Sequence, residues 1–226
     1  MAGKRRISRR WLIPAAVVVV VVIAALVVYV SPLLHVRSVE VEGTQNLTAD
    51  EVRDASGVQE GQNLARLDTS AAASGVSRLP WTDSVTVSRS WPSTVRIDVT
   101  EHEAVGVLDD GGDPAVVDAD GRLFLRGVTP DGVKKITARA DDQGAVTAAA
   151  GALAAVRQLD QDLYDQVESA DAPGANDVVL KFPEGREVYW GSADRAADKA
   201  EATRVVLTRE GARWNVSNPG LPSVRE

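Results

Sequence analysis

The chain has 226 residues, with 25 Lys and Arg against 32 Asp and Glu, a formal net charge of −7 and no cysteine. The lack of cysteine excludes thiol catalysis, disulfide bridges and metal sites with Cys ligands. The acidic balance excludes a general attraction to nucleic acid or to anionic lipid. The length beyond residue 30 is sufficient for one or two self-sufficient hydrophobic cores.

The first 30 residues predict a membrane anchor. Residues 11–30 carry no charge, and twenty residues of helix match the hydrocarbon thickness of a bilayer, about 30 Å. Trp11 and Tyr29 stand near the two ends, where amphipathic rings prefer the interface. The five basic residues of the 1–10 tail predict a cytoplasmic N-terminus and an extracytoplasmic remainder, a single-pass type II arrangement. The alternative is a cleaved secretory signal, but Tyr29-Val30-Ser31-Pro32 is a poor cleavage site.

The first block after the anchor begins with a strand and a helix. Residues 36–43 alternate apolar and polar side chains and end in Gly43, which predicts a strand followed by a turn. Thr48 can cap a helix with Glu51 as its capping-box partner, and this helix should end at Gly57.

A second helix and a hairpin complete this block. Asp68 or Thr69 can cap a helix over residues 70–79, which Pro80 stops. Apolar residues then alternate over 85–87 and 95–99 around a short Trp-Pro-Ser-Thr connection, which is typical of a β-hairpin with one buried face. The order strand, helix, helix, strand, strand predicts an α+β unit with two helices on one face of a three-stranded sheet.

The second block begins near residue 103 and is richer in strands. The patterns predict strands at 105–108, 115–118, 123–125, 178–182, 187–190 and 213–217. They predict a helix from Gln143 or Thr147 to Leu159 and another, capped by Ser192, that ends near Thr208. Residues 127–142 and 169–177 have no clear pattern, and no element is assigned to them.

Several residues have both a structural and a functional interpretation. The acids of 109–113 and 118–121 fit turn chemistry better than calcium binding, because the EF-hand spacing and its final Glu are missing. Arg89 is interpreted as a solvated strand residue or a surface ion pair, with a partner contact as the alternative. Trp81 and Trp91 are expected to pack against the helices, and residues 160–162 are expected to form a solvated helix end.

The sequence offers little for catalysis. Its only histidines are His35 and His102, and it has neither G-x-S-x-G nor H-E-x-x-H. A pair of carboxylates can meet in space from any two positions, so hydrolysis by such a pair stays open. The expectation is nevertheless a protein that is not an enzyme and that uses no cofactor, metal or small-molecule substrate.

The last predicted strand suits partner binding. A strand close to a chain end commonly lies at a sheet margin with one row of backbone groups unpaired, and a partner strand can add there. Trp214 is the natural anchor of such a contact, since large aromatic residues are frequent at interface hot spots. The alternative is that Trp214 and Val216 face the core of the domain.

The ordered motifs resemble the bacterial cell-division family FtsQ, also called DivIB. Residues 36–43 match its V-x-x-V-x-V-x-G strand, and 61–64 with Leu67-Asp68 match its G-x-N-L and apolar-Asp segment. The hairpin fits P-W … V-x-R-x-W-P-x-T … E through Pro80-Trp81, Val85, Val87, Arg89, Trp91-Pro92, Thr94, Ile97, Val99 and Glu101. Asp118, Gly121 and Phe124 match the D-x-x-G-x-x-F opening of the family's β-domain.

The resemblance implies a POTRA domain at 34–102, an FtsQ-type mixed β-sheet domain with flanking helices at 103–217 and a tail at 218–226. It implies a non-catalytic scaffold at the division septum that binds FtsB- and FtsL-type partners and regulates septal peptidoglycan synthesis. The implied partner-binding residues are Trp214, Asn215, Val216, Ser217, Asn218, Pro219 and Gly220.

Two other functions stay open. One is a POTRA-bearing, membrane-anchored protein of transport or assembly, although such proteins typically carry tandem POTRA repeats and a barrel. The other is a membrane-tethered cell-wall hydrolase, which would release fragments from peptidoglycan.

Overall fold

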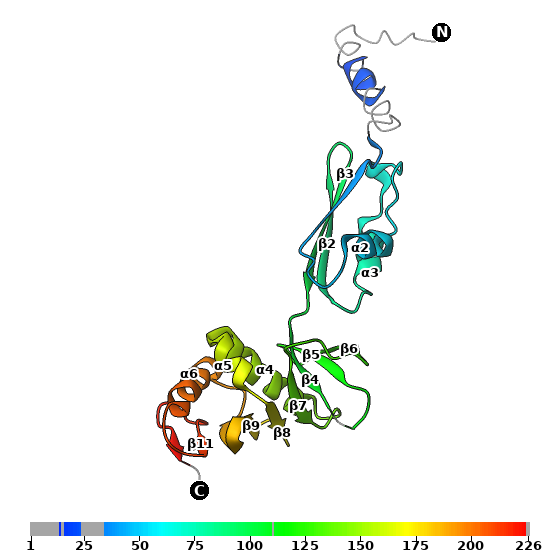
Figure 1. Cartoon of the computed structure of the whole chain (residues 1–226). Helices are drawn as coiled ribbons and strands as arrows, with labels where there is room; N and C mark the ends of the chain where they lie inside the picture. Colours follow the sequence, from blue (N-terminus) through cyan, green and yellow to red (C-terminus); the bar gives the residue numbers. More distant parts are fainter. Residues whose placement is uncertain (1–13, 15, 24–33, 110, 225–226) are drawn as a thin grey trace, which may run out of the picture. The chain divides into compact units, whose positions relative to one another are not determined.

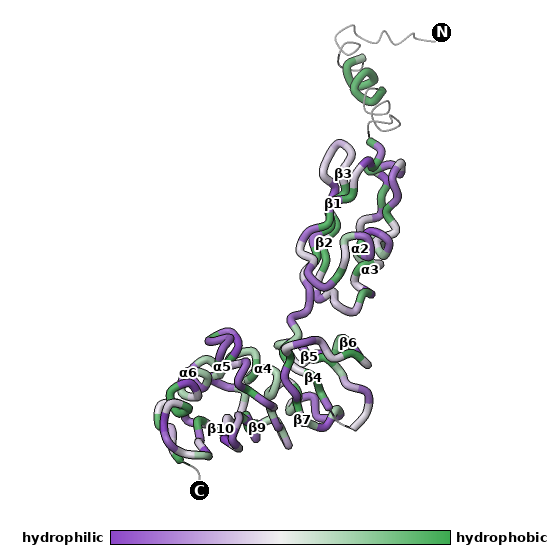
Figure 2. Tube along the Cα trace, viewed as in Figure 1, coloured by the Kyte–Doolittle hydropathy of each residue, from purple (hydrophilic) through white to green (hydrophobic). Residues whose placement is uncertain are grey.

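The structure is a computed structural model that describes residues 14, 16–23, 34–109 and 111–224. Its contacts divide the chain into two compact units, Met1–Glu101 and His102–Glu226. The predicted basic tail 1–10 lies outside the described residues, as does most of the predicted anchor 11–30. Residues 14 and 16–23 of that anchor are helical and exposed, and Figure 2 shows their apolar character. Within the part that the structure describes, no helix is both long and apolar enough to cross a bilayer.

Unit 1 has the predicted order of elements (Figure 1). Its three-stranded sheet has the order β1-β3-β2, in which β3 pairs with β1 in parallel and with β2 in antiparallel register. Helices α2 and α3 pack against each other on one side of this sheet. The α+β prediction for this unit is confirmed. The elements are β1 (Ser38–Glu42), α2 (Ala49–Ser56), η2 (Leu64–Arg66), α3 (Thr69–Val76), β2 (Thr82–Ser90) and β3 (Thr94–Glu101).

The predicted helix ends of α2 are confirmed. The Thr48 side chain accepts a hydrogen bond from the Glu51 amide, and the Glu51 carboxylate accepts one from the Thr48 amide, which completes a capping box. Gly57 ends the helix in the left-handed conformation. For α3 the cap is Asp68, but the helix ends at Val76 rather than at residue 79. The last residues before Pro80 form tighter turns instead, with the Leu79 amide bonded to the Val76 carbonyl.

The core of unit 1 follows from the alternation in β3. Val95, Ile97 and Val99 are buried, and they meet apolar residues of α2 and α3. Trp81 packs against this core, as predicted. The same prediction is wrong for Trp91, which is 57% exposed because it stands in the connection between β2 and β3, beyond the reach of the helices.

Arg89 is an exposed residue of β2, which confirms the first of its two predicted interpretations, and its guanidinium binds backbone rather than forming the alternative ion pair with a described residue. Its guanidinium donates hydrogen bonds to the backbone carbonyls of Leu64 and Leu67, at the two ends of η2. The arginine thus satisfies carbonyl groups of the segment between the two helices and fastens that segment to β2. Sequence reasoning missed this role, because the bonds connect positions more than twenty residues apart.

Glu101, at the end of β3, holds the loop that follows β1. Its carboxylate accepts hydrogen bonds from the backbone amides of Gln45, Asn46 and Leu47 and from the Asn46 side chain, at 2.8–3.1 Å. Burial alone would raise the pKa of this carboxyl group, but the amides of Leu47, Gln45 and Asn46 favour the charged form. The net result is a pKa below the usual value.

We expect Glu101→Gln to lower the free energy of unfolding of unit 1 by about 1–3 kcal/mol near pH 7, because an amide group then faces amide donors. Because the pKa of Glu101 is lower in the folded state, its ionised carboxylate stabilises unit 1 at pH values above the unfolded-state pKa, about 4.3. This stabilisation is lost as the pH falls through the folded-state pKa. The gap between wild type and variant should therefore shrink in acid, measured by urea unfolding at stepped pH.

The control for this comparison is Glu42→Gln, in the same unit, whose exposed carboxylate lies 3.9 Å from Arg96. It should shift stability by less than about 1 kcal/mol. A Glu101→Gln effect equally large at pH 3 and pH 7 would contradict a role for the ionised carboxylate.

Unit 2 is built on one mixed sheet with the order β12-β11-β10-β9-β8-β7-β4-β5-β6. The pairs β4–β7, β7–β8 and β10–β11 are parallel, and the others are antiparallel. The prediction of a mixed sheet with flanking helices is confirmed. The strands are β4 (Ala104–Leu108), β5 (Ala115–Asp118), β6 (Leu123–Arg126), β7 (Lys134–Ala138), β8 (Ser169–Ala172), β9 (Val178–Phe182), β10 (Arg186–Gly191), β11 (Arg213–Asn215) and β12 (Ser223–Val224).

Three of these strands, β7, β8 and β12, were not predicted. Strands β7 and β8 lie in the two segments left without an assignment, 127–142 and 169–177. Their sequences, KKITA and SADA, bury only alternate small residues and Ile136, so they carry little strand signal. They form because parallel pairing places them in the middle of the sheet beside β4, a contact between distant parts of the chain.

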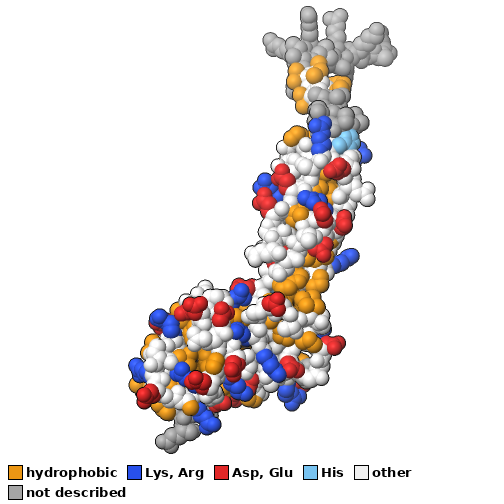
Figure 3. Space-filling view, in the orientation of Figure 1, with side chains coloured by type: hydrophobic (Ala, Val, Ile, Leu, Met, Phe, Trp, Pro, Cys, Tyr) orange, Lys and Arg blue, Asp and Glu red, His pale blue; other side chains and the backbone are white. Residues whose placement is uncertain are grey.

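Three helices accompany this sheet: α4 (Gln143–Leu159), α5 (Gln161–Gln166) and α6 (Ala196–Leu207). Helix α4 packs on β4, β7, β8 and β9 and also contacts α5 and α6 (Figure 1). Its many buried alanines allow this close packing. Residues 160–162 form a solvated helix end, as predicted: Asp160 is the C-cap of α4, and Gln161 and Asp162 are exposed. The Asp160 carboxylate also caps α5 through the amides of Asp162 and Leu163. Figure 3 shows acidic and basic side chains interspersed over the visible face of both units.

Candidate functional site

The predicted docking strand is not at the margin of the sheet. Strand β11 pairs in parallel with β10 on one side, with Trp214 opposite Val188. On its other side it pairs in antiparallel register with β12, with Trp214 opposite Val224 and Asn215 opposite Ser223. The expectation of an unpaired edge along 213–217 is therefore wrong for Trp214 and Asn215, because a later segment of the same chain covers it.

A local turn produces this arrangement. The Asn215 side chain accepts a hydrogen bond from the Ser217 amide at 2.9 Å, and the Leu221 amide donates to the Asn218 carbonyl at 3.0 Å. Pro219 occupies the second position of the latter turn, which its fixed φ favours. These turns reverse the chain and return Ser223 and Val224 to β11. The Asn218-Pro219-Gly220 sequence is a turn signal from which β12 could have been predicted.

The seven predicted partner-binding residues divide into two groups. Trp214 is 6% exposed and Val216 is fully buried, so both belong to the core of unit 2. Gly211 brings its backbone against the Trp214 indole, where an added Cβ would lie 3.1 Å from Nε1. The other five are accessible to solvent to differing degrees. Asn215 is the last residue of β11, and the turns after it contain Ser217, Asn218, Pro219 and Gly220.

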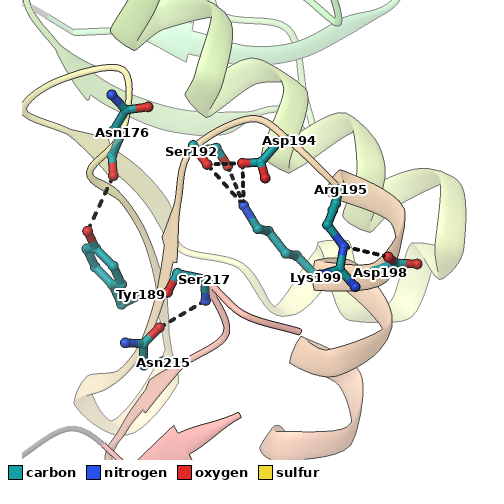
Figure 4. A network of polar contacts seen from close by, with 9 residues as sticks. All are labelled: Asn176, Tyr189, Ser192, Asp194, Arg195, Asp198, Lys199, Asn215 and Ser217. Atoms are coloured by element: carbon teal, nitrogen blue, oxygen red, sulfur yellow. Dashed lines mark hydrogen bonds and ion pairs between the residues drawn. The ribbon is translucent and has the colours of Figure 1, made fainter. Parts of the chain in front are cut away.

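A buried lysine shapes the neighbouring loop between β10 and α6 (Figure 4). Lys199 of α6 is fully buried, and its Nζ donates to the Ser192 carbonyl at 2.8 Å and to Asp194 Oδ1 at 3.1 Å. The hydrogen bond from the Ser192 hydroxyl, followed by Lys199, lowers the pKa of Asp194. Ser192 therefore does not cap α6 as predicted. The helix begins after Arg195, a residue with positive φ whose guanidinium bonds Asp198 at 3.0 Å.

A cavity of about 440 Å³ lies between α6 and the turn after β11. Its apolar lining includes Ala202, Val205 and Val206 on the helix and Pro219 and Pro222 on the turn. Charged residues also line it: Arg195, Asp198, Glu201 and Arg209. Within the described ranges 34–109 and 111–224, three of the six exposed large apolar side chains belong to this region, namely Val205, Leu221 and Val224.

The acidic turns of unit 2 act as turns, as predicted. Asp109 accepts a hydrogen bond from the Gly111 amide, and Asp118 accepts from the amides of Asp120 and Arg122. Asp118 has a further role that was not predicted, since its second oxygen lies 2.8 Å from His102 Nδ1 and both side chains are almost buried. The His102 ring stacks on Phe124 with centroids 4.6 Å apart.

Comparisons with known proteins agree with the sequence motifs. Residues 34–102 match the family model described as "POTRA domain, FtsQ-type". The Cell division protein FtsQ of Corynebacterium glutamicum is 36% identical over 201 residues, which cover 88% of this chain and 90% of that protein. Its counterpart in Mycobacterium leprae is 34% identical over 201 residues, which cover 88% of this chain and 58% of that protein.

Among solved structures, the major extracytoplasmic domain of the cell-division protein DivIB from Geobacillus stearothermophilus is similar to part of this chain. The TM-score is 0.36 and the sequence identity 18%, over 48% of this chain and 93% of that domain.

Proposed function

We propose that this chain, which belongs to the FtsQ family of cell-division proteins, is a non-catalytic scaffold of the division machinery. In this proposal residues 11–30 anchor it in the membrane with a cytoplasmic N-terminus, and residues 34–102 and 103–217 stand outside as POTRA domain and β-domain. The β-domain binds FtsB- and FtsL-type partners and links them to septal peptidoglycan synthesis. The similarity to the C. glutamicum protein over most of both chains supports this assignment.

A depletion experiment tests the role in division. Cells that lose the protein should become filamentous, and a fluorescent fusion should concentrate at midcell. A uniform membrane signal together with normal septation would refute the proposal. Release of fragments from peptidoglycan by the purified protein would instead favour the hydrolase alternative.

The observation that supports docking at β11 is the weakness of the contact with β12. That contact comprises two residue pairs, and Ser223 and Val224 are both exposed, so little apolar surface holds the strand in place. A partner strand in the same antiparallel orientation would meet the same backbone groups of Trp214 and Asn215. It could also bury Val205 of α6 in the adjacent cavity. We therefore propose that the partner strand replaces β12 on β11.

If the partner strand replaces β12, docking is best tested by removing β12 rather than by substituting Trp214 or Val216. A charge at Trp214 or Val216 would disrupt the core, because both side chains are buried, and would not report on docking alone. A chain that stops after Gly220 lacks β12 and should bind an FtsB-type protein from the same organism several-fold more tightly, since no strand must first be displaced. Biolayer interferometry with the immobilised partner would measure this ratio.

Two substitutions serve as matched controls. Val224→Pro keeps the length but weakens the pairing with β11, so it should resemble the shortened chain. Leu221→Ser lies outside β12 and should leave the affinity unchanged. Equal affinity of the full and shortened chains would contradict displacement, and loss of binding only on shortening would show that the partner pairs with β12 itself. No binding by either form would refute docking at this edge.

A further inference from the structure

Trp91 is an unusual tryptophan in this protein. Its side chain is 57% exposed, whereas Trp190 and Trp214 are buried and Trp81 packs on the core of unit 1. Pro92 beside it is exposed as well. A single exposed apolar side chain is common on protein surfaces, so its location decides whether it has a function.

The pairing of β1 with β3 fixes that location within unit 1. The strands are parallel with Ser38 opposite Thr94, and the Arg37 amide donates to the Ser93 carbonyl at 2.8 Å. The start of β3 therefore lies beside the start of β1. Because the connection with Trp91 precedes β3, it extends from the same end of the sheet at which the chain enters β1.

The chain that leads to this end is short. The Val36 amide donates to the Gln62 carbonyl, and the Val36 carbonyl accepts from the Gly61 amide, so the chain is fixed to unit 1 from Val36 onward. If the anchor ends at residue 30, residues 31–35 span at most about 20 Å even when fully extended. The end of unit 1 that carries Trp91 must then stay within that distance of the bilayer surface.

We infer that the connection at Trp91 and Pro92 inserts into the headgroup region of the lipid bilayer, with the Trp91 indole as its anchor. This inference rests on the proposed membrane anchor. An indole prefers the interface because its ring is apolar and its N–H can bond to water or lipid. Arg37, exposed at the same end, adds a cation that suits lipid phosphates, with Glu60 as the neighbouring acid.

The experiment uses the full chain in vesicles of phosphatidylcholine and phosphatidylglycerol that contain a nickel-chelating lipid. The chain has no cysteine, so a nitroxide can be attached specifically at Ser90→Cys or at Ser84→Cys. Both positions are exposed on β2, and six residues of strand separate them by about 20 Å. Paramagnetic broadening of the nitroxide spectrum then reports its distance from the lipid surface.

We expect several-fold stronger broadening at position 90 than at position 84. Trp91→Ser should reduce the broadening at position 90 to nearly that at position 84. Equal broadening at the two positions in the otherwise wild-type chain, or strong broadening at position 90 that survives Trp91→Ser, would overturn the inference. If the chain does not float with the vesicles at all, the proposed anchor fails instead, so the two outcomes are distinguishable.

Discussion

Gly43→Ala is expected to destabilise unit 1 by about 3–5 kcal/mol, which combines left-handed backbone strain with a steric clash. Gly43 follows β1 with a φ of +86°, and an added Cβ would lie 2.0 Å from the Val99 carbonyl oxygen. The clash is with backbone in the middle strand of the sheet, so β1 and β3 would have to separate. Urea unfolding followed by hydrogen exchange of peptides from 34–101 measures the loss, with peptides from unit 2 as the internal reference.

Gly57→Ala isolates the contribution of the clash. Gly57 also has a positive φ, +65°, but an added Cβ would meet nothing within 4 Å. Its replacement should cost about 1–2 kcal/mol from backbone strain alone. Equal losses for the two variants would show that the approach of Gly43 to Val99 is not a tight contact.

Asp118→Ala is expected to destabilise unit 2 by about 3 kcal/mol, because it removes a buried carboxylate to which three groups donate hydrogen bonds. Those donors are the amides of Asp120 and Arg122 and the His102 ring. The His102 ring would then stay buried against Phe124 without its carboxylate partner. Hydrogen exchange of peptides that cover 102–126 should detect the loss.

The matched control is Asp120→Ala, two residues along the same turn. The Asp120 carboxylate is mostly exposed and lies 3.8 Å from Arg122, a weak surface pair. Its removal should change stability by less than about 1 kcal/mol. If both variants unfold alike, the turn as a whole would be fragile and Asp118 would have no special role.

The structure gives physical reasons for motifs that resemble the family. In the D-x-x-G-x-x-F pattern, Asp118 caps its turn and pairs with His102, and Phe124 stacks on His102. Gly121 has a positive φ, and an added Cβ would meet the Thr147 backbone of α4 at 2.6 Å. In the hairpin pattern, Arg89 and Glu101 each hold a loop by its backbone. Each position thus serves a contact between segments distant in sequence.

Elements whose signals are local could be predicted from the pattern of residues alone. The capping box at Thr48, the helix end at Gly57 and the alternation in β3 each depend on neighbours within a few residues, and each was predicted correctly. The long helix α4 and the hairpin of β9 and β10 were predictable for the same reason. Local propensity and periodicity were sufficient to identify the α+β unit, whereas the mixed sheet of unit 2 was implied by the resemblance to the family.

Which edges and side chains are accessible depends on contacts between segments that are distant in sequence. Strands β7 and β8 exist because distant segments pair in the middle of the sheet, and β12 covers β11 because a turn returns the chain to it. Trp214 and Trp91 are both tryptophans, yet the first is buried and the second is exposed. Burial depends on what the whole fold places against a residue, and no local pattern contains that information.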